Sequence, residues 1–320
     1  MAAITRLKRW KCLILILVRR YLRQLCSTLL DSNRHAGVGY LFAVIASVGL
    51  GSAVAFSRAA YDGGTDALSV STVRAVFGSC LVGLFCLGSG RSLRVPRRLW
   101  SHLLCLGLMI GYMFYGNIGA VEYIPVGLAA LLFFVYPPLV AVFVAVVDRR
   151  PVGGLKSLAL ISAFVGLIMM LGVGFETVEW RGVALALAAG VLCAVNAVWI
   201  ARVMHGIDVL VMTFYMTAIG AAVLLVATIG AGGVTLPTGS IGWWGAFGVV
   251  LCQGCSIPFF YASLPRIGPE KAAMLNNLQP VTSVLMAYLL FAETLSSAQI
   301  FGGVMVLGGI LLMQWQDRRS

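Results

Sequence analysis

A polar stretch interrupts an apolar run near the C-terminal end of the chain, and its residues have clear potential for binding chemistry. The stretch, residues 275–283, reads LNNLQPVTS and lies between KAAM and VLMAYLLF. Asn276, Gln279 and Ser283 are spaced three and seven residues from the first, so they share one helix face. Pro280 lacks an N–H group and clashes with the carbonyl four residues earlier, which predicts a local helix break. Neutral amides beside a freed carbonyl can bind a small polar molecule through hydrogen bonds.

Polar side chains from four other predicted helices are expected at similar depths. The predicted substrate-binding set comprises Asn276, Asn277 and Gln279, together with Asn196, Gln253, Tyr112 and Tyr136. A few polar groups in an apolar, aromatic wall are typical of a small-molecule pocket. The wall is expected from Phe133, Phe134, Tyr115 and Trp199. The alternative is that these groups only join helices, at about 0.6 kcal/mol per hydrogen bond. We predict that Pro280 and Pro137 act as helix hinges.

Arg74 is a cation well inside an apolar span, eight residues after Asp66. At 1.5 Å per residue this is roughly 12 Å along the helix. An intramembrane cation is a functional hypothesis by default. Arg74 can hold a substrate carboxylate, or it can pair structurally with a backbone carbonyl or with Asp66. Both interpretations stay open from the sequence.

The elements that must position these residues are membrane helices. Of the 320 residues, 60% are hydrophobic and 11% are charged, whereas soluble domains carry about 25% charge. Windows of about 20 residues predict ten spans. They cover residues 37–57, 67–88, 100–120, 126–147, 155–174, 182–203, 209–230, 241–263, 272–292 and 297–315. The predicted fold class is therefore an all-α integral membrane protein.

The net charge of +12 is explained by topology, so no nucleic-acid partner is expected. With a cytoplasmic N-terminus, the inner loops and tail hold twelve cations: Arg91, Arg94, Arg97, Arg98, Arg149, Arg150, Lys156, Arg202, Arg266, Lys271, Arg318 and Arg319. The outer loops hold two, Arg58 and Arg181. Positive charge gathers on the cytoplasmic side of membrane proteins. Both termini are therefore predicted to be cytoplasmic, and a bacterial inner membrane is the expected location.

Residues 1–36 differ from the rest of the chain. They are basic, and the apolar piece Cys12–Val18 is too short to span a membrane. We predict an interfacial cytoplasmic segment that binds anionic lipids. An organelle-targeting peptide or a start codon placed too far upstream are the alternatives.

An internal repeat is visible as one constant shift in residue number. Gly39–Ala43 matches Gly182–Ala186 (182 − 39 = 143), and Pro137 matches Pro280 at the same shift. Gly166 and Gly309 form a further match. Each half has five predicted spans, and an odd number makes the second half enter the membrane upside down. Inverted repeats of this kind are typical of secondary transporters.

Four segments carry a family resemblance. They read GYLFAVIASVGLGSAVAF (39–56), STVRAVFGS (71–79), AVEYIPVGLAALLFFVYPPLVAVF (120–143) and NLQPVTSVLMAYLLFAETLSSAQIFGGVMVLGGILL (277–312). The chain resembles the drug/metabolite transporter superfamily, in its EamA-type branch. The resemblance implies two repeats, at 37–174 and 182–315, and transport of small metabolites such as amino acids. Family members often have a glutamate after the fourth helix, where this chain reads Asp148-Arg149-Arg150.

The predicted function is secondary transport of a small organic metabolite, with efflux of amino acids or related compounds by alternating access. Alternatives are a nucleotide-sugar or sugar-phosphate exchanger and a membrane-embedded enzyme. Histidines 35, 102 and 205 fall at the cytoplasmic surface, so neither catalysis nor a metal site is expected, and no cofactor is predicted. The expected partners are the substrate and the bilayer, with a homodimer left open.

Overall fold

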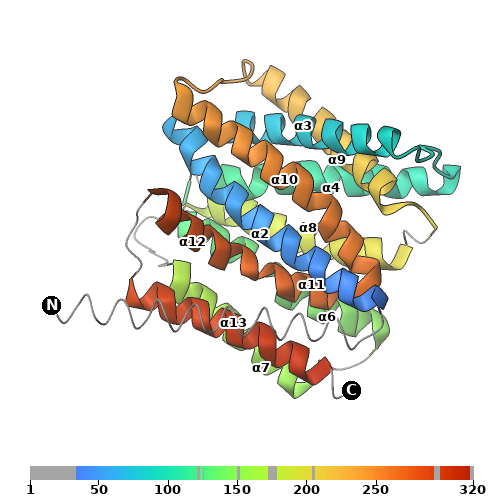
Figure 1. Cartoon of the computed structure of the whole chain (residues 1–320), viewed down its shortest axis with the longest axis vertical. Coiled ribbons are helices and arrows are strands. Elements are labelled where there is room, and N and C mark those ends of the chain that lie inside the picture. The colour runs from blue at the N-terminus through green and yellow to red at the C-terminus, as the bar shows by residue number, and fades with distance from the viewer. Residues whose placement is uncertain are drawn as a thin grey trace.

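The computed structural model describes residues 34–120, 123–124, 126–149, 152–171, 179–203, 206–291 and 296–317. Helices and connecting turns make up these residues, with no β-strand among them. The helices are α2 (Arg34–Asp62), α3 (Ala67–Gly88), the 3-10 helix η1 (Arg97–Leu99), α4 (Trp100–Gly119), α5 (Val126–Phe133), α6 (Tyr136–Asp148), α7 (Gly154–Leu171), α8 (Trp180–Val203), α9 (Val209–Gly230), α10 (Ser240–Ile267), α11 (Pro269–Asn276), α12 (Leu278–Phe291) and α13 (Ser297–Asp317) (Figure 1). The basic segment predicted at 1–36 lies outside the described residues except for its last three.

The protein is an integral membrane protein. Within the described residues, eight helical segments are long and apolar enough to cross a membrane, and Ser297–Met313 is a shorter apolar one. Large apolar side chains face outward from the bundle, for example Leu84, Val226 and Trp244 with exposures of 68%, 72% and 72%. Such a surface is costly in water and suits lipid. The all-helical membrane fold is confirmed, whereas the count of ten spans remains a prediction.

Local signals set several helix ends. Asp66 and Asp208 cap α3 and α9, where Asp66 Oδ1 accepts from Ser69 N at 2.7 Å and Asp208 Oδ1 accepts from Leu210 N at 2.9 Å. Carboxylates at this position satisfy N–H groups that have no partner in the helix. Gly268, with φ of +83°, separates α10 from α11, and glycine adopts this left-handed backbone at low cost.

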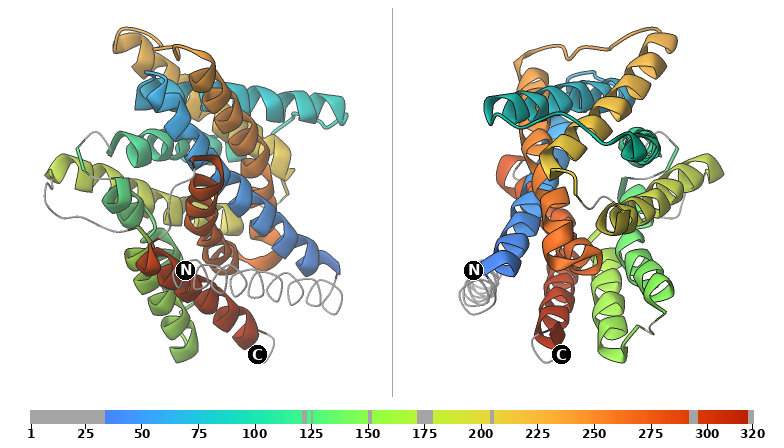
Figure 2. Two further views of the ribbon diagram at one scale, coloured as in Figure 1. Left: turned by 60° about the vertical axis from the view of Figure 1, so that its left-hand side comes forward. Right: turned by 90° about the vertical axis from the view of Figure 1, so that its right-hand side faces the viewer.

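Helices of the two halves pack against each other. Helix α2 lies along α10, α4 along α8, α3 along α9, and α7 along α13. Figure 2 shows α2 in blue crossing beside α10 in orange in both views. Close approach needs small residues. A β-carbon at Gly245 of α10 would lie 2.5 Å from the backbone N of Ala60 in α2.

The internal repeat is visible in equivalent contacts. A β-carbon at Gly39 would lie 2.7 Å from the side chains of Arg266 and Ile267. A β-carbon at the equivalent residue, Gly182, would lie 2.8 and 2.9 Å from the side chains of Tyr123 and Ile124. Each residue of the first contact is related to its counterpart by the same shift (182 − 39 = 266 − 123 = 267 − 124 = 143). Equivalent glycines thus seat equivalent helix ends in the two halves.

Helices α7 and α13 are counterparts of each other and run antiparallel. Gly166 of α7 faces Gly302, whose carbonyl would lie 2.6 Å from a β-carbon at Gly166, and Gly309 faces the carbonyl of Ala159 at the same distance. Ser162 Oγ donates to the carbonyl of Met305, its own counterpart in the repeat, at 3.4 Å. Residues that contact their own counterparts lie near the axis relating the halves.

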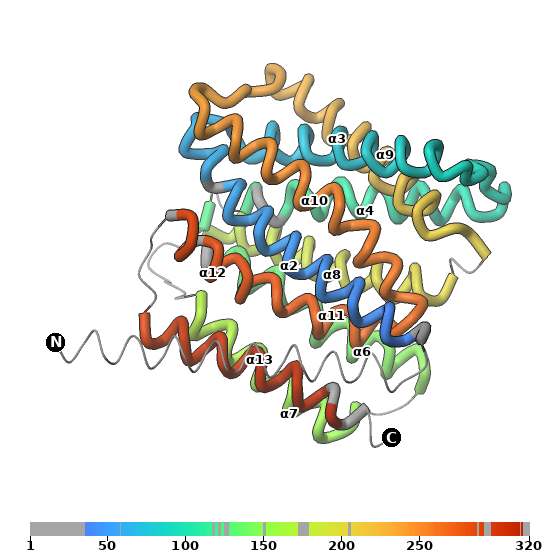
Figure 3. Tube along the Cα trace, in the orientation of Figure 1, coloured from blue at the N-terminus to red at the C-terminus, as the bar shows by residue number. Residues whose placement is uncertain are grey.

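Two predicted spans are divided into short helices. The fourth is divided between α5 and α6. The ninth is divided between α11 and α12, which follow one another along one line in Figure 3. The first pieces end at Phe133 and Asn276, which occupy the same position in the repeat (276 − 133 = 143). Pro137 is the second residue of α6, and Pro280 is the third residue of α12. Proline is tolerated in a first helical turn because its missing N–H has no partner there.

Candidate functional site

The polar stretch that opens at Leu275 lies at the division between α11 and α12. Asn276 ends α11 and Asn277 is its C-cap residue, with helical dihedral angles. The backbone N of Asn277 bonds the carbonyl of Met274 at 3.2 Å, so the helix tightens at this one residue before α12 begins at Leu278. The break therefore occurs three residues before Pro280, just ahead of the turn that accommodates the proline.

Asn276 joins three helices through hydrogen bonds. Its Nδ2 donates to Tyr136 Oη of α6 at 2.7 Å, and its Oδ1 accepts from Ser47 Oγ of α2 at 3.1 Å. Ser47 Oγ also lies 3.2 Å from the carbonyl of Leu275, and Tyr136 Oη lies 3.5 Å from the carbonyl of Ala273. All three side chains are buried. We call Ser47, Tyr136 and Asn276 the break network, because it connects the breaks in the two halves.

Aromatic rings surround the break network on the side of the first half. Phe133, Phe134 and Tyr136 pack against one another with ring centroids 5.5 to 6.0 Å apart. Of the expected wall residues, Phe133 and Phe134 thus lie beside Tyr136. Wall and hydrogen-bonding groups together are typical of a small-molecule site.

The two breaks differ in polarity. The Ser47 hydroxyl hydrogen-bonds the carbonyl of Leu275. Its counterpart in the repeat is Gly190, where a β-carbon would lie 3.1 Å from the carbonyl of Leu132, the counterpart of Leu275. Position 276 holds asparagine, whereas its counterpart is Phe133. The second half thus supplies the side-chain amide, and the first half supplies the aromatic wall and two hydroxyls, those of Ser47 and Tyr136.

Asn196 belongs to a second hydrogen-bonded group. Its Nδ2 donates to the carbonyl of Leu106 in α4 at 3.4 Å, and its Oδ1 accepts from Tyr261 Oη of α10 at 3.2 Å. One turn along α8, Trp199 Nε1 donates to His102 Nδ1 at 3.3 Å. We call Asn196 and Tyr261 the second network. Both networks border the same core cluster of buried residues.

The other predicted binding residues are not part of either network. Asn277 Nδ2 lies 3.4 Å from Met274 Sδ, and Gln253 is buried in α10. Gln279 and Tyr112 are half-buried, and the backbone carbonyl of Gln279 packs so closely on Gly51 of α2 that a β-carbon there would collide with it. The structure thus joins Asn276 to Tyr136 and places Asn196 in a neighbouring group.

Two members of the networks were missed by the sequence interpretation. Ser47 is absent from the predicted set, although a hydroxyl in an apolar span needs an acceptor. Tyr261 lies in the same predicted span as Gln253, but only Gln253 was included in the predicted set. A tyrosine hydroxyl inside a predicted span was the available signal.

Arg74 lies apart from both networks. Its Nη2 donates to the carbonyl of Phe114 in α4 at 2.7 Å, and its guanidinium carbon lies 5.1 Å from the centre of the Phe114 ring. Within the part of the chain that the structure describes, its Nε is buried without a hydrogen-bond partner. Asp66 caps α3 instead of pairing with Arg74. Of the two structural pairings expected for Arg74, these contacts match the one with a backbone carbonyl. The Nε group, which has no partner, leaves one donor for a ligand.

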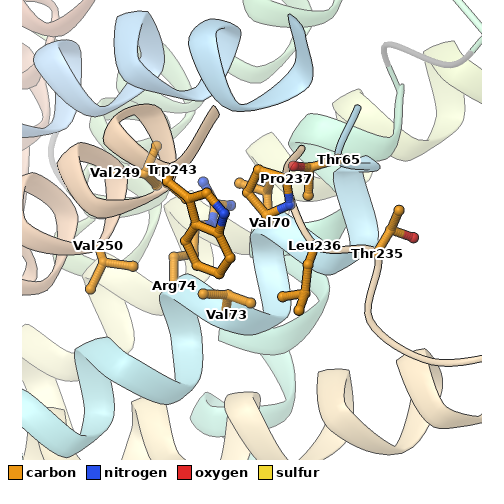
Figure 4. Close-up of a pocket in the computed structure, with 11 residues that line it drawn as sticks. Thr65, Val70, Val73, Arg74, Thr235, Leu236, Pro237, Trp243, Val249 and Val250 are labelled. Atoms are coloured by element: carbon orange, nitrogen blue, oxygen red, sulfur yellow. The ribbon is translucent and has the colours of Figure 1, made fainter. Parts of the chain in front are cut away.

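Arg74 also lines a small cavity of about 40 Å³ between α3, α10 and the loop before α10. Val70, Val73, Leu236, Pro237 and Trp243 form much of its wall, and Figure 4 shows Arg74 extending beneath the Trp243 ring. The lining of this cavity is almost wholly apolar.

The described residues contain no cluster of three histidine, cysteine, aspartate or glutamate side chains able to hold a metal ion. The two networks consist of amides and hydroxyls, which form hydrogen bonds with neutral or charged ligands. Reversible binding is the chemistry that such a set supports.

Comparison with known proteins agrees with this architecture. A family model described as the EamA-like transporter family matches residues 37–172 and again 180–315. An uncharacterized transporter of Archaeoglobus fulgidus is 29% identical over 276 residues, which are 86% of this chain and 95% of that protein. An uncharacterized transporter of Synechocystis is 24% identical and covers 79% of this chain and 83% of its own length.

A solved crystal structure of a protein shares the fold, with a TM-score of 0.75 and 18% identity. It covers 88% of this chain and 98% of its own. The starts of the two family matches differ by the same shift (180 − 37 = 143) that relates the packing contacts of the two halves. The chain therefore belongs to the EamA-like transporter family.

Proposed function

We propose that this membrane transporter exports a small organic metabolite, an amino acid or a related compound, by alternating access. In the proposed topology ten spans form two inverted five-helix repeats, 37–174 and 182–315. Both termini lie in the cytoplasm of a bacterial cell, and the N-terminal segment rests on anionic lipids of the inner membrane.

The observation that carries the proposal is the pair of divided helices. One occurs in each half at the same repeat position, after Phe133 and after Asn276. In secondary transporters, divided helices meet near the membrane midplane and bind substrate through freed backbone groups and helix ends. Here Asn276 and Tyr136 bring the two breaks together at 2.7 Å.

The substrate is proposed to bind at the break network and the second network. Both networks hydrogen-bond internally, so a ligand takes over bonds that the protein already makes. Exchange of this kind costs little free energy, because one set of hydrogen bonds replaces another. Asn277, Gln279, Gln253 and Tyr112 are proposed to line the path around the two networks. Weak, exchangeable contacts suit a transporter, which must release what it binds.

The charge pattern favours a substrate with one carboxylate over a phosphate ester. Recognition of a phosphate group usually employs several cations or a guanidinium fork with further donors. Arg74 contributes a single guanidinium whose Nε has no partner among the described residues. It lies outside both networks, so it is proposed to meet the substrate carboxylate on the path to them. A sugar-phosphate or nucleotide-sugar exchanger is therefore the second candidate, and the networks of neutral groups favour the first.

Transport by purified protein in lipid vesicles tests the proposal. We expect uptake and efflux of one or more amino acids or related carboxylates from a metabolite panel. Arg74→Lys keeps the charge but loses the planar fork, so it should weaken transport of the carboxylate. A carboxyl-free analogue, if carried, should be transported at the same rate by Arg74→Lys as by the parent protein.

Ser162→Ala is the matched control, because it removes a single hydrogen bond between α7 and α13, away from both networks. It should leave transport unchanged. Absence of transport for every carboxylate, with phosphate esters carried instead, would support the second candidate. Equal losses for the carboxylate and its analogue in Arg74→Lys would make Arg74 structural.

A further inference from the structure

Three ion pairs connect the first half of the chain to the second. Lys156 Nζ of α7 lies 2.6 Å from Glu270 Oε2 of α11, and Arg202 of α8 lies 2.5 Å from Asp148 at the end of α6. Arg91, after α3, pairs with Asp208 at the start of α9. In each pair one residue comes from residues 37–172 and the other from 180–315, the two segments matched by the family model.

All three pairs lie at one end of the bundle. The residues stand at the ends of α3, α6 and α8 and at the beginnings of α7, α9 and α11, which lie toward the right and lower right of Figure 1. This end also carries Arg94, Arg97 and Arg98 after α3 and Arg149 after α6, and we call it the arginine-rich face. The proposed orientation assigns it to the cytoplasm. Arg181 and Glu179, in contrast, pair at 3.7 Å within the second half, two residues apart at the start of α8.

The repeat places no charged residue at the corresponding positions of the opposite face. Adding or subtracting 143 gives the position that each charged residue would occupy in the other half. The six counterparts are Gln299 and Gly127 for Lys156 and Glu270, Phe291 and Ala59 for Asp148 and Arg202, and Val234 and Thr65 for Arg91 and Asp208. None of these six residues is charged, so the pairs have no equivalents at the corresponding positions.

Lys156–Glu270 is the most enclosed of the three pairs, with 26% and 16% of the side chains exposed. It also lies close to the break network. Glu270 is three residues before Ala273 on α11, and the carbonyl of Ala273 lies 3.5 Å from Tyr136 Oη. Opening of this pair would move α11 at the point where the candidate substrate site begins.

We propose that the three ion pairs form a gate on the arginine-rich face, and that the lack of counterparts biases the resting transporter toward the state closed on that face. This inference rests on the proposed alternating-access function. In an inverted repeat, the two access states exchange the conformations of the halves. Contacts that have no counterpart at the repeat-related positions therefore stabilise one state over the other.

The gate is expected to be weak enough to open. Partly exposed ion pairs shift an equilibrium by about 1.4- to five-fold each. Three such pairs make a resting bias that substrate binding can overcome, whereas a fully buried pair would be much harder to separate once desolvated.

The test measures access to Ala273, which is fully buried, without any substrate. Ala273→Cys is placed in a cysteine-free chain reconstituted in vesicles, and its labelling rate with a membrane-impermeant thiol reagent is measured from each side. Glu270→Gln and Lys156→Gln should each raise the rate from the arginine-rich side by about 1.4- to five-fold. Lys156→Glu, which places two carboxylates together, should raise it at least as much.

The exchanged pair, Lys156→Glu with Glu270→Lys, should return the rate toward that of the parent chain. Arg181→Gln is the control, because it removes a pair within one half, and it should change nothing. Detectable labelling at one rate in all variants would overturn the gate while leaving transport untouched. A rate that stays high in the exchanged pair would also overturn it. No labelling from either side in any variant would count against both the gate and alternating access.

Discussion

Asn276 Nδ2 lies 2.7 Å from Tyr136 Oη, so the residue that ends α11 in the second half bonds the residue that begins α6 in the first. The contact spans 140 residues of sequence. Tyr136 is fully buried, and Asn276 is 5% exposed. Each half is interrupted at this contact, so movement of one half relative to the other must change it.

The first prediction concerns the hydroxyl of Tyr136. Tyr136→Phe keeps the ring packed against Phe133 and Phe134 but removes the acceptor for Asn276. A neutral hydrogen bond is worth about 0.5–1.5 kcal/mol, so the half-saturating substrate concentration should rise about two- to twelve-fold. Affinity and transport are to be measured on purified, folded protein, since the fold also depends on this network.

Tyr215→Phe is the matched control. The Tyr215 hydroxyl donates to the carbonyl of Leu93 at 2.9 Å, outside both networks, so its loss should change stability slightly and affinity not at all. Equal effects of the two substitutions on yield, with unchanged affinity in both, would show that Tyr136 only holds helices together.

The second prediction concerns Pro280 as a hinge. Pro280→Ala supplies an N–H group that can bond the carbonyl of Asn276, so the helix can run on through Asn277. A straightened span should resist the bending that alternating access requires. The turnover number should therefore fall more than the affinity, and Pro137→Ala should act in the same direction in the first half.

Pro258, inside the continuous helix α10, offers the comparison. Pro258→Ala restores a bond within an unbroken helix, so it should leave turnover near that of the parent protein. A fall in affinity without any fall in turnover in Pro280→Ala would argue against a hinge.

The helices and both breaks were predictable from local signals. Apolar length predicts spans such as 182–203, observed as Trp180–Val203, and proline predicts a break near Pro280, observed at Asn277. The repeat was readable from Gly39, Gly182, Pro137 and Pro280, because the same contact in each half selects similar residues.

Side-chain partners were not predictable, because the sequence supplies depth along a helix but not the direction in which each face points. Asn196 and Asn276 were expected in one site from their depth. The structure places them in two groups because Asn196 faces α4 and α10, whereas Asn276 faces α2 and α6. Likewise Arg74 turns to a backbone carbonyl, since Asp66 is held by Ser69 at the start of the same helix.

The third prediction concerns acid stability at the start of α3. Burial alone raises the pKa of Asp66, but hydrogen bonds from the Thr235 and Ser69 side chains and from the backbone of Ser69 and Leu68 outweigh it. The pKa therefore lies below its ordinary value of 3.8. Asp66 thus stabilises the fold fully above about pH 4, and this stabilisation is lost as pH falls through the lowered pKa.

Asp66→Ala removes both the helix cap and the charge, and should lower stability at pH 7 by about 0.5–2 kcal/mol. Thermal unfolding in detergent, followed from pH 7 to pH 3, should show the difference from the parent protein shrinking on acidification. Asp62→Ala, at an exposed acid four residues earlier, should differ little at any pH. A constant difference for Asp66→Ala across the range would mean that its charge does not contribute.

The last prediction concerns orientation. Twelve lysines and arginines in the inner loops and tail against two in the outer loops place the ends of α3 and α6 in the cytoplasm. Single cysteines at Ser92 and Gly153, both exposed, should be labelled by an impermeant thiol reagent only when the cytoplasmic side is accessible. Cysteines at Thr238 and Ser240, exposed at the opposite end, should be labelled from outside intact cells. These four positions are matched in exposure, so differences in rate report sidedness rather than burial. Labelling of Ser92→Cys from outside would reverse the orientation, and with it the direction in which the ion-pair gate closes.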